Sequence, residues 1–345
     1  MKFGMIGSGS WGTAIVKILT DGNHRVTWCV RNEKMIAYIR QRKHNPNYLS
    51  SVNFNPDLLD LTTKPEEVFR QSDAIIIATP SAYVITNLEG INSSDCEGKK
   101  IISAVKGMLP EKNLLLNDYL KNQIDFNLQD YHTIMGPCHA EEVAAEKLSY
   151  LTFSGLNESF TEEIAAHFKT PYINTVINSD IYGVQFAAIL KNIYALGAGI
   201  AHGLEYGDNF LSVLIANCAD EMAGFLRKVG IMNIEVGVHS KPNPNRPRKS
   251  PNYAASVYLG DLLVTCYSLY SRNRTFGNMI GKGYSVQSTQ LEMNMVAEGY
   301  NASKSIFMIN QNINADMPIA ETVYRILWEQ MPASEGFNKI EWSLI

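Results

Sequence analysis

The chain has 345 residues. A single hydrophobic core rarely serves a chain of this length, so two domains are expected. Its 46% hydrophobic and 19% charged residues are typical of a globular protein and exclude global disorder. A formal net charge of -4 gives no electrostatic reason to bind nucleic acid. The five cysteines are scattered and form no CxxC pair, so neither a disulfide framework nor a bound metal is predicted.

The sequence carries no signal for export or for stable membrane insertion. The apolar stretch at residues 1–6 is too short for the core of a signal peptide. The most apolar long window, residues 186–204, contains Lys191, and a lysine in the middle of a membrane span is costly. We therefore expect this window to form a buried helix in a cytoplasmic protein.

The first half of the chain alternates between short apolar runs and helical patterns. Strands are predicted at residues 2–6, 25–30, 73–78, 100–105, 132–135, 150–153 and 172–177, and helices at 11–20, 33–42 and 113–121. Runs that are apolar throughout, such as residues 74–78, are typical of a parallel sheet buried on both faces. The alternation predicts the α/β class, with an N-terminal doubly wound sheet.

The second half changes character, because strand signals nearly vanish after residue 178. Helices are predicted at residues 181–203, 209–229, 253–266, 286–297 and 302–311. The domains are therefore predicted as residues 1–178 and a mostly α-helical domain at residues 179–345. Between two of these helices, residues 240–251 hold four prolines and four basic residues. This segment is predicted to be a solvated surface loop, with a basic contact patch as the alternative.

The strongest local motif is the GxGxxG at residues 7–12, which follows a predicted strand and opens a predicted helix. Gly7 permits the tight turn, Gly9 lets the backbone approach a pyrophosphate, and Gly12 lets helix and strand pack closely. This context predicts a Rossmann-type dinucleotide site. The second strand is followed by Arg31, where an acidic residue would hold the ribose of NAD. An arginine there favours NADP, or tolerance of both cofactors, with a solvated arginine at the end of the strand as the alternative.

Two lysines are candidates for the chemistry. Lys191 lies in a mostly apolar helical pattern, where it either extends to solvent or is buried. Burial would lower its pKa and help it to exchange a proton with a carbonyl oxygen. Lys106 follows the predicted strand at residues 100–105, at the end where open sheets bind ligands. It suits an anionic or carbonyl substrate, although a surface lysine is the alternative.

The remaining candidates are grouped in three segments. Residues 136–140 follow a strand and could approach a nicotinamide, with Cys138 and His139 expected to be packing residues rather than catalysts. If helical, Asp261 and Thr265 share one face. Arg272 and Asn273 supply donors that suit a phosphate.

Together these motifs resemble the NAD(P)-dependent glycerol-3-phosphate dehydrogenases of the bacterial type. The resemblance spans nearly the whole chain and is carried by GSGSWGTA at residues 7–14, AVKG at 104–107, GPCHAEEV at 136–143, LKNIYALGAGI at 190–200, LGDLLVTC at 259–266, SRNRTFG at 271–277 and VAEGY at 296–300. The chain departs from the family at Cys138, where serine or threonine is common, and at residues 216–222, where Thr-Arg-Gly usually precedes Glu-Met.

The resemblance implies roles for individual residues. It makes Lys191 the general acid/base, and it implies a substrate shell of Lys106, Asn192, Asp261, Thr265, Ser271, Arg272 and Asn273. It implies cofactor contacts from Gly7, Gly9, Ser10, Trp11, Gly12, Arg31, Lys106, Gly136, Cys138, Ala140, Arg272, Val296 and Glu298. The family combines a Rossmann domain with a helical domain.

The function implied is the interconversion of dihydroxyacetone phosphate and sn-glycerol 3-phosphate by hydride transfer with NADPH or NADH. The product would supply glycerophospholipid synthesis, and a homodimer is expected. One alternative is a ketopantoate-type or other hydroxyacid reductase, whose carboxylate substrate Arg272 could also bind. A second alternative is a non-catalytic NAD(P)H-sensing protein, against which Lys106, Lys191 and Asp261 argue.

Overall fold

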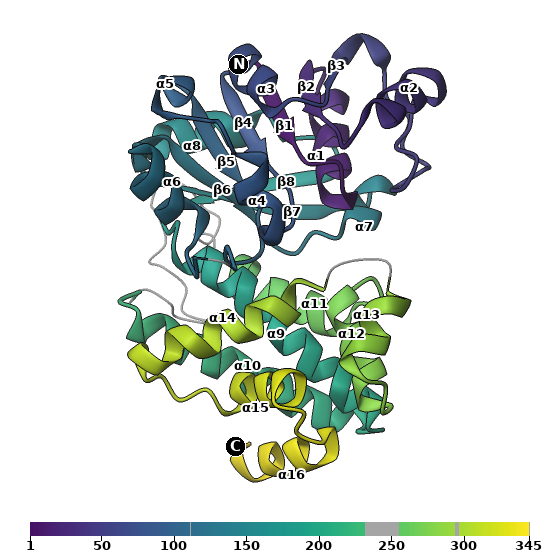
Figure 1. Ribbon diagram of the computed structural model, residues 1–345, viewed down its shortest axis with the longest axis vertical. Helices are drawn as coiled ribbons and strands as arrows, with labels where there is room; N and C mark the ends of the chain where they lie inside the picture. Colours follow the sequence, from purple (N-terminus) through teal and green to yellow (C-terminus); the bar gives the residue numbers. More distant parts are fainter. Residues whose placement is uncertain (111, 232–254, 294–296, 345) are drawn as a thin grey trace, which may run out of the picture. The chain divides into compact units, whose positions relative to one another are not determined.

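The computed structural model describes residues 1–110, 112–231, 255–293 and 297–344 (Figure 1). These residues form two compact units. The first contains Met1–Val105 and Leu114–Ile181, and the second contains Lys106–Asn113 and Tyr182–Ile345. The change near residue 181 lies close to the boundary expected at residue 178. Lys106–Asn113 belongs to the second unit, whereas a single boundary at residue 178 would place this segment in the first. The proline-rich segment at 240–251 and Val296 lie outside the described residues.

The first unit is built on one eight-stranded sheet with the order β3-β2-β1-β4-β5-β6-β7-β8, which confirms the α/β class and the Rossmann-type architecture. The strands are β1 (Phe3–Ile6), β2 (Val26–Cys29), β3 (Leu59–Thr62), β4 (Ala74–Ile77), β5 (Lys100–Ser103), β6 (Tyr131–Met135), β7 (Ser149–Gly155) and β8 (Ile173–Asn178). Its helices are α1 (Ser10–Asp21), α2 (Glu33–Arg42), α3 (Pro65–Gln71), α4 (Val84–Asn87), α5 (Ser93–Cys96), α6 (Leu116–Ile124), α7 (Ala140–Ala144) and α8 (Glu158–Ala166), with short 3-10 turns η1 (Pro56–Leu58), η2 (Ser81–Tyr83) and η3 (Leu128–Asp130).

The sheet is mostly parallel, with one antiparallel pair of strands. Strand β7 pairs antiparallel with β6, and Met135 at the end of β6 lies opposite Thr152 of β7. The connection between these two strands is residues 136–148 and contains the five-residue helix α7. Strand β3 was not predicted, because Asp60 interrupts its apolar run and the strand lies at the sheet edge.

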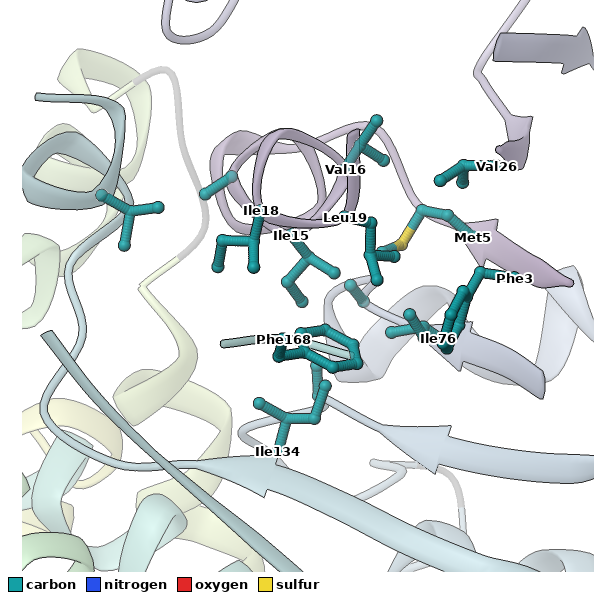
Figure 2. Close-up of a cluster of buried hydrophobic side chains, with 14 of the residues drawn as sticks. Phe3, Met5, Ile15, Val16, Ile18, Leu19, Val26, Ile76, Ile134 and Phe168 are labelled. Carbon is teal, nitrogen blue, oxygen red and sulfur yellow. The ribbon is translucent and has the colours of Figure 1, made fainter. Parts of the chain in front are cut away.

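Helix α1 is fixed on the sheet by a fully buried hydrophobic cluster. Figure 2 shows Ile15 and Leu19 of α1 gathered with Phe3, Ile76 and Phe168. All five side chains are excluded from solvent. Burial of each such side chain contributes about 1.5–3 kcal/mol. Because the cluster holds α1 against β1, the turn between them at residues 7–9 has a fixed place at the carboxyl end of β1.

The second unit is helical, as the sequence predicts. Its elements are α9 (Gly183–Gly203), α10 (Asp208–Lys228), the π-helical η4 (Ala255–Gly260), α11 (Asp261–Tyr267), α12 (Arg272–Gly281), α13 (Val286–Glu292), α14 (Glu298–Ile313), α15 (Pro318–Trp328) and α16 (Ala333–Ser343). Helix α13 ends at Glu292, earlier than the predicted residue 297, and α12, α15 and α16 were not predicted.

Helix α9 is the central element of this unit. It packs against α10, α11, α12, α14 and α15. By length and composition it could cross a membrane, but 94% of its most apolar window is buried inside the protein. Such burial is typical of a core helix, in agreement with the buried helix predicted from the sequence.

Glycines bring α9 and α12 into direct backbone contact. A Cβ added to Gly199 of α9 would lie 2.1 Å from the carbonyl oxygen of Arg274. A Cβ added to Gly277 of α12 would lie 2.1 Å from the carbonyl oxygen of Leu196. Gly203 and Gly281 repeat this arrangement one turn further along. No other residue type fits at these positions, so the sequence fixes how closely the two helices approach.

The Gly277→Ala substitution should therefore separate α9 from α12. We expect the free energy of unfolding to fall by at least about 2 kcal/mol, because the new methyl group meets backbone that cannot rotate away. Gly224→Ala in α10 is the matched control, since a Cβ there meets nothing within 4 Å. It should stabilise the protein by roughly 0.5–1 kcal/mol through helix propensity. Chemical denaturation measures both, and equal effects would contradict the contact.

Candidate active site

The glycine-rich turn of the first unit has the geometry that a dinucleotide requires. Gly7 has φ 126°, which L side chains rarely adopt, and Gly12 packs so closely that a Cβ would lie 2.4 Å from the carbonyl oxygen of Gly7. A Cβ on Gly9, by contrast, would meet nothing within 4 Å. Gly7 and Gly12 are therefore required by packing, whereas the space beside Gly9 is open to a ligand. The residues present fit a bound pyrophosphate at the N-terminus of α1.

The other predicted cofactor residues of this unit lie along the same sheet edge. Strands β1, β2 and β6 run in one direction, so their carboxyl ends share an edge. Arg31 follows β2 and is exposed. Gly136 follows β6 with φ 119°, and a Cβ there would lie 2.8 Å from the carbonyl oxygen of Tyr150. Cys138 is buried, and Ala140 begins α7.

A buried ion pair lies in the second unit. Nζ of Lys191, on α9, contacts Oδ1 of Asp261, the first residue of α11. Both residues are almost fully buried, with 3% and 2% of their surface exposed. Thr265 donates from Oγ1 to the carbonyl oxygen of Asp261 at 2.5 Å, which confirms that the two share a helix face. Oδ2 of Asp261 has no hydrogen-bond partner among the described residues.

The environment of Lys191 adjusts its proton affinity. Burial lowers the pKa of Lys191 to about 8, because removal from water disfavours the charged amine. The carboxylate of Asp261 opposes this effect, and the positive charge of Lys106 adds to it. Lys191 is therefore an amine that can hold or release a proton close to neutral pH, as predicted for a buried lysine.

A chain of amide hydrogen bonds joins four segments of the same unit. Asn273 of α12 donates from Nδ2 to Oδ1 of Asn192 at 2.9 Å, and it accepts from the backbone N–H of Gly299 at 3.0 Å. Asn192 donates from Nδ2 to the carbonyl oxygen of Lys106 at 3.2 Å. These bonds tie Lys106 and the N-terminus of α14 to α9 and α12. Glu298, predicted to contact the cofactor, is the first residue of α14.

Most of the predicted substrate shell is thereby gathered in one unit. Ser271 caps α12 by accepting from the backbone N–H of Arg274, and Arg272 is the first residue of that helix. Lys106 itself belongs to this unit rather than to the sheet unit. Within the described ranges, no group of three or more histidine, cysteine or acidic residues is arranged to hold a metal ion.

Sequence reasoning missed a buried acid that organises the core. Glu221 of α10 accepts from the backbone N–H groups of Ile319 and Ala320, at 2.8 and 3.0 Å, and so caps the N-terminus of α15. Burial raises the pKa of Glu221 to about 8. Its spacing in the helical pattern gives no signal of this role, because the partner helix lies about a hundred residues away in the chain.

Comparison with known proteins shows the family to which the chain belongs. The family models for the N-terminus and the C-terminus of NAD-dependent glycerol-3-phosphate dehydrogenase match residues 2–161 and 180–338. The chain is 30% identical over 338 residues to a glycerol-3-phosphate dehydrogenase [NAD(P)+] of Chlorobium chlorochromatii, covering 97% of this chain and 96% of that protein. The chain belongs to the NAD-dependent glycerol-3-phosphate dehydrogenase family.

Further relatives of the family support the fold. A glycerol-3-phosphate dehydrogenase [NAD(P)+] of Listeria monocytogenes is 31% identical, with 98% of this chain and 95% of that protein covered. The crystal structure of the glycerol-3-phosphate dehydrogenase of Coxiella burnetii superposes with a TM-score of 0.85 at 23% identity, covering 98% of both chains. The fold of that structure therefore extends over 98% of this chain.

The buried pair makes a prediction about stability. Lys191→Met leaves the Asp261 carboxylate buried without its counter-charge, and we expect the free energy of unfolding to fall by about 3–5 kcal/mol. The double variant Lys191→Met with Asp261→Asn contains no buried charge at this place and should recover part of that loss. Denaturant unfolding of the wild type, both single variants and the double variant measures the coupling. Purely additive effects would show that the two groups do not stabilise each other.

Proposed function

We propose that the protein interconverts dihydroxyacetone phosphate and sn-glycerol 3-phosphate by hydride transfer with NADH or NADPH. The observation that carries the proposal is the buried Lys191–Asp261 pair, an amine prepared to exchange a proton with a carbonyl oxygen. Family membership and the printed activity of the relatives, glycerol-3-phosphate dehydrogenase [NAD(P)+], support the choice of reaction.

The cofactor would supply or accept the hydride when bound. In the first unit, the glycine turn would bind its pyrophosphate, and Arg31 would favour a 2′-phosphate or tolerate its absence. The residues proposed for this role are Gly7, Gly9, Ser10, Trp11, Gly12, Arg31, Gly136, Cys138 and Ala140, with Lys106, Arg272, Val296 and Glu298 as further candidates.

The substrate phosphate would be bound at the N-terminus of α12. Arg272 supplies a planar fork of donors there, and the helix dipole favours an anion. Asn273 has its oxygen and one N–H engaged within the protein, so it can offer only its second N–H to a ligand. Asn192 and Asn273 would therefore have two roles. They would hold Lys106 and α12 in place, and they would also contact the substrate. Ser271 and Thr265 complete the shell.

The proton step would be carried by Lys191. In the reduction, Lys191 gives its proton to the ketone oxygen as negative charge develops on that oxygen. Asp261 keeps the amine oriented and favours its charged form. Lys106 brings a second positive charge near the amine, which lowers its proton affinity and eases the transfer. In the oxidation, the same amine accepts the proton of the alcohol.

The proposal also covers the metabolic use of the product, the cellular compartment and the oligomeric state. Glycerol 3-phosphate made by this reaction would supply glycerophospholipid synthesis in the cytoplasm. The five free cysteines, all buried, suit a reducing compartment. The enzyme would act as a homodimer, as the resemblance implies, and the mass in solution measures this part directly.

Steady-state kinetics tests the reaction itself. The wild type should reduce dihydroxyacetone phosphate with NADH or NADPH, and should turn over 2-keto acids roughly a hundredfold more slowly. Lys191→Ala should lower kcat by about 10²–10⁴-fold, because the proton donor is removed, while the cofactor Kd stays within about twofold. Near-normal turnover by Lys191→Ala, or a preference for 2-keto acids, would exclude the proposed reaction.

The pH dependence of the reaction gives a second test, because two variants should shift its midpoint in opposite directions. Only protonated Lys191 can act as the acid, so kcat/KM for ketone reduction should fall as pH rises through about 8. Asp261→Asn removes the charge that raises the pKa of Lys191, so the midpoint should move to lower pH. Lys106→Met removes the charge that lowers it, so the midpoint should move to higher pH. Shifts in the same direction would rule out Lys191 as the titrating group.

A further inference from the structure

The three consecutive carbonyl groups of the glycine-rich turn, at residues 7–9, all accept hydrogen bonds from other residues of the first unit. The indole Nε1 of Trp28 donates to the carbonyl oxygen of Gly7 at 2.9 Å, and Nδ2 of Asn45 donates to that of Ser8 at 3.1 Å. The carbonyl oxygen of Gly9 accepts from both the backbone N–H and the hydroxyl of Thr13, at 2.9 and 2.8 Å. Every carbonyl of the turn is therefore bound by a residue of the first unit.

This pattern fixes the direction of the N–H groups. In a planar trans peptide, the carbonyl of one residue and the N–H of the next point in opposite directions. Because the carbonyls of Gly7 and Ser8 are bound by interior donors, the N–H groups of Ser8 and Gly9 point away from those donors. These are the groups that a Gly-rich turn offers to a phosphate.

Asn45 is the centre of this arrangement. It is fully buried, and besides Ser8 its Nδ2 binds the hydroxyl of Thr13 at 2.7 Å. Its Oδ1 accepts from the backbone N–H groups of Asn47 and Tyr48, at 2.9 and 3.3 Å. Backbone N–H groups can only donate, so they determine which end of the amide is oxygen. The NH₂ group must therefore face the turn, and the loop after α2 holds Asn45 in that orientation.

We propose that Asn45, acting with Thr13, is a positioning residue that keeps the turn at residues 7–9 in its dinucleotide-binding conformation. The inference rests on the proposed function, since it concerns the cofactor of that reaction. Two of the three turn residues are glycines, which lose the most conformational freedom when they become ordered. A turn already fixed before binding avoids this entropy loss, and so binds the cofactor more tightly.

The Thr13 variants provide the sharpest test. Thr13→Val keeps the shape but removes the hydroxyl that binds both Asn45 and Gly9, and Thr13→Ser keeps the hydroxyl. Titration calorimetry of the full-length protein with NADH and NADPH should show about five- to twentyfold weaker binding for Thr13→Val. Asn45→Ala should weaken binding by a similar factor. Thr13→Ser should stay within about twofold of the wild type, and kcat at saturating cofactor should change little in all three.

Thr161→Val is the matched control. Thr161 is an equally buried threonine of the same unit that donates to the carbonyl oxygen of Asn157 at 2.7 Å and contacts a side chain, His132. This variant should lower the melting temperature as Thr13→Val does and leave the cofactor Kd unchanged. Wild-type affinity in Thr13→Val and Asn45→Ala, or an equal loss in Thr161→Val, would overturn the positioning role. A wild-type protein that binds neither cofactor would instead refute the proposed function.

Discussion

The close approach of α9 and α12 is the constraint on which the helical unit depends. Gly199 and Gly203 face Gly277 and Gly281, and the two backbones touch with no side chain between them. Gly299 brings α14 close to α9 as well, since a Cβ there would lie 2.5 Å from the carbonyl oxygen of Asn192. Rigid backbone contact of this kind sets the spacing between residues carried by different helices. It allows Asn192 and Asn273 to meet at hydrogen-bond distance.

The same packing explains the chemistry of Lys191. Helices that enclose α9 exclude water from its side chain, and exclusion of water lowers the pKa of an amine. A lone buried ammonium would be unstable, so Asp261 must accompany it. Stability alone does not explain the pair, since apolar residues of similar size would stabilise such a core equally well. In the sheet unit, glycines again permit close backbone contact, and there they leave an open face beside Gly9.

Much of the fold could be predicted from local patterns. Strands such as β1 and β4 are apolar throughout, because both sheet faces are covered, and this signal is visible in four or more consecutive residues. Strand β3 was not predicted, because it lies at the edge of the sheet and Asp60 interrupts its apolar residues. The antiparallel pairing of β7 also escaped, because strand direction depends on where the preceding connection leads and not on the strand's own residues. Helices α15 and α16 pack against each other, and this packing covers their apolar faces.

The sequence by itself determined the glycine turn, the division into a sheet part and a helical part, and the identity of Lys191 and Asp261 as candidates. These features depend on residue type and short spacing, which a linear chain displays directly. Only the tertiary structure decided that Lys191 and Asp261 pair, that Asn273 reaches Asn192 and Gly299, and that Asn45 holds the turn at Ser8. Such contacts join residues 26 to 81 positions apart, and folding alone brings groups at that separation within a few ångströms.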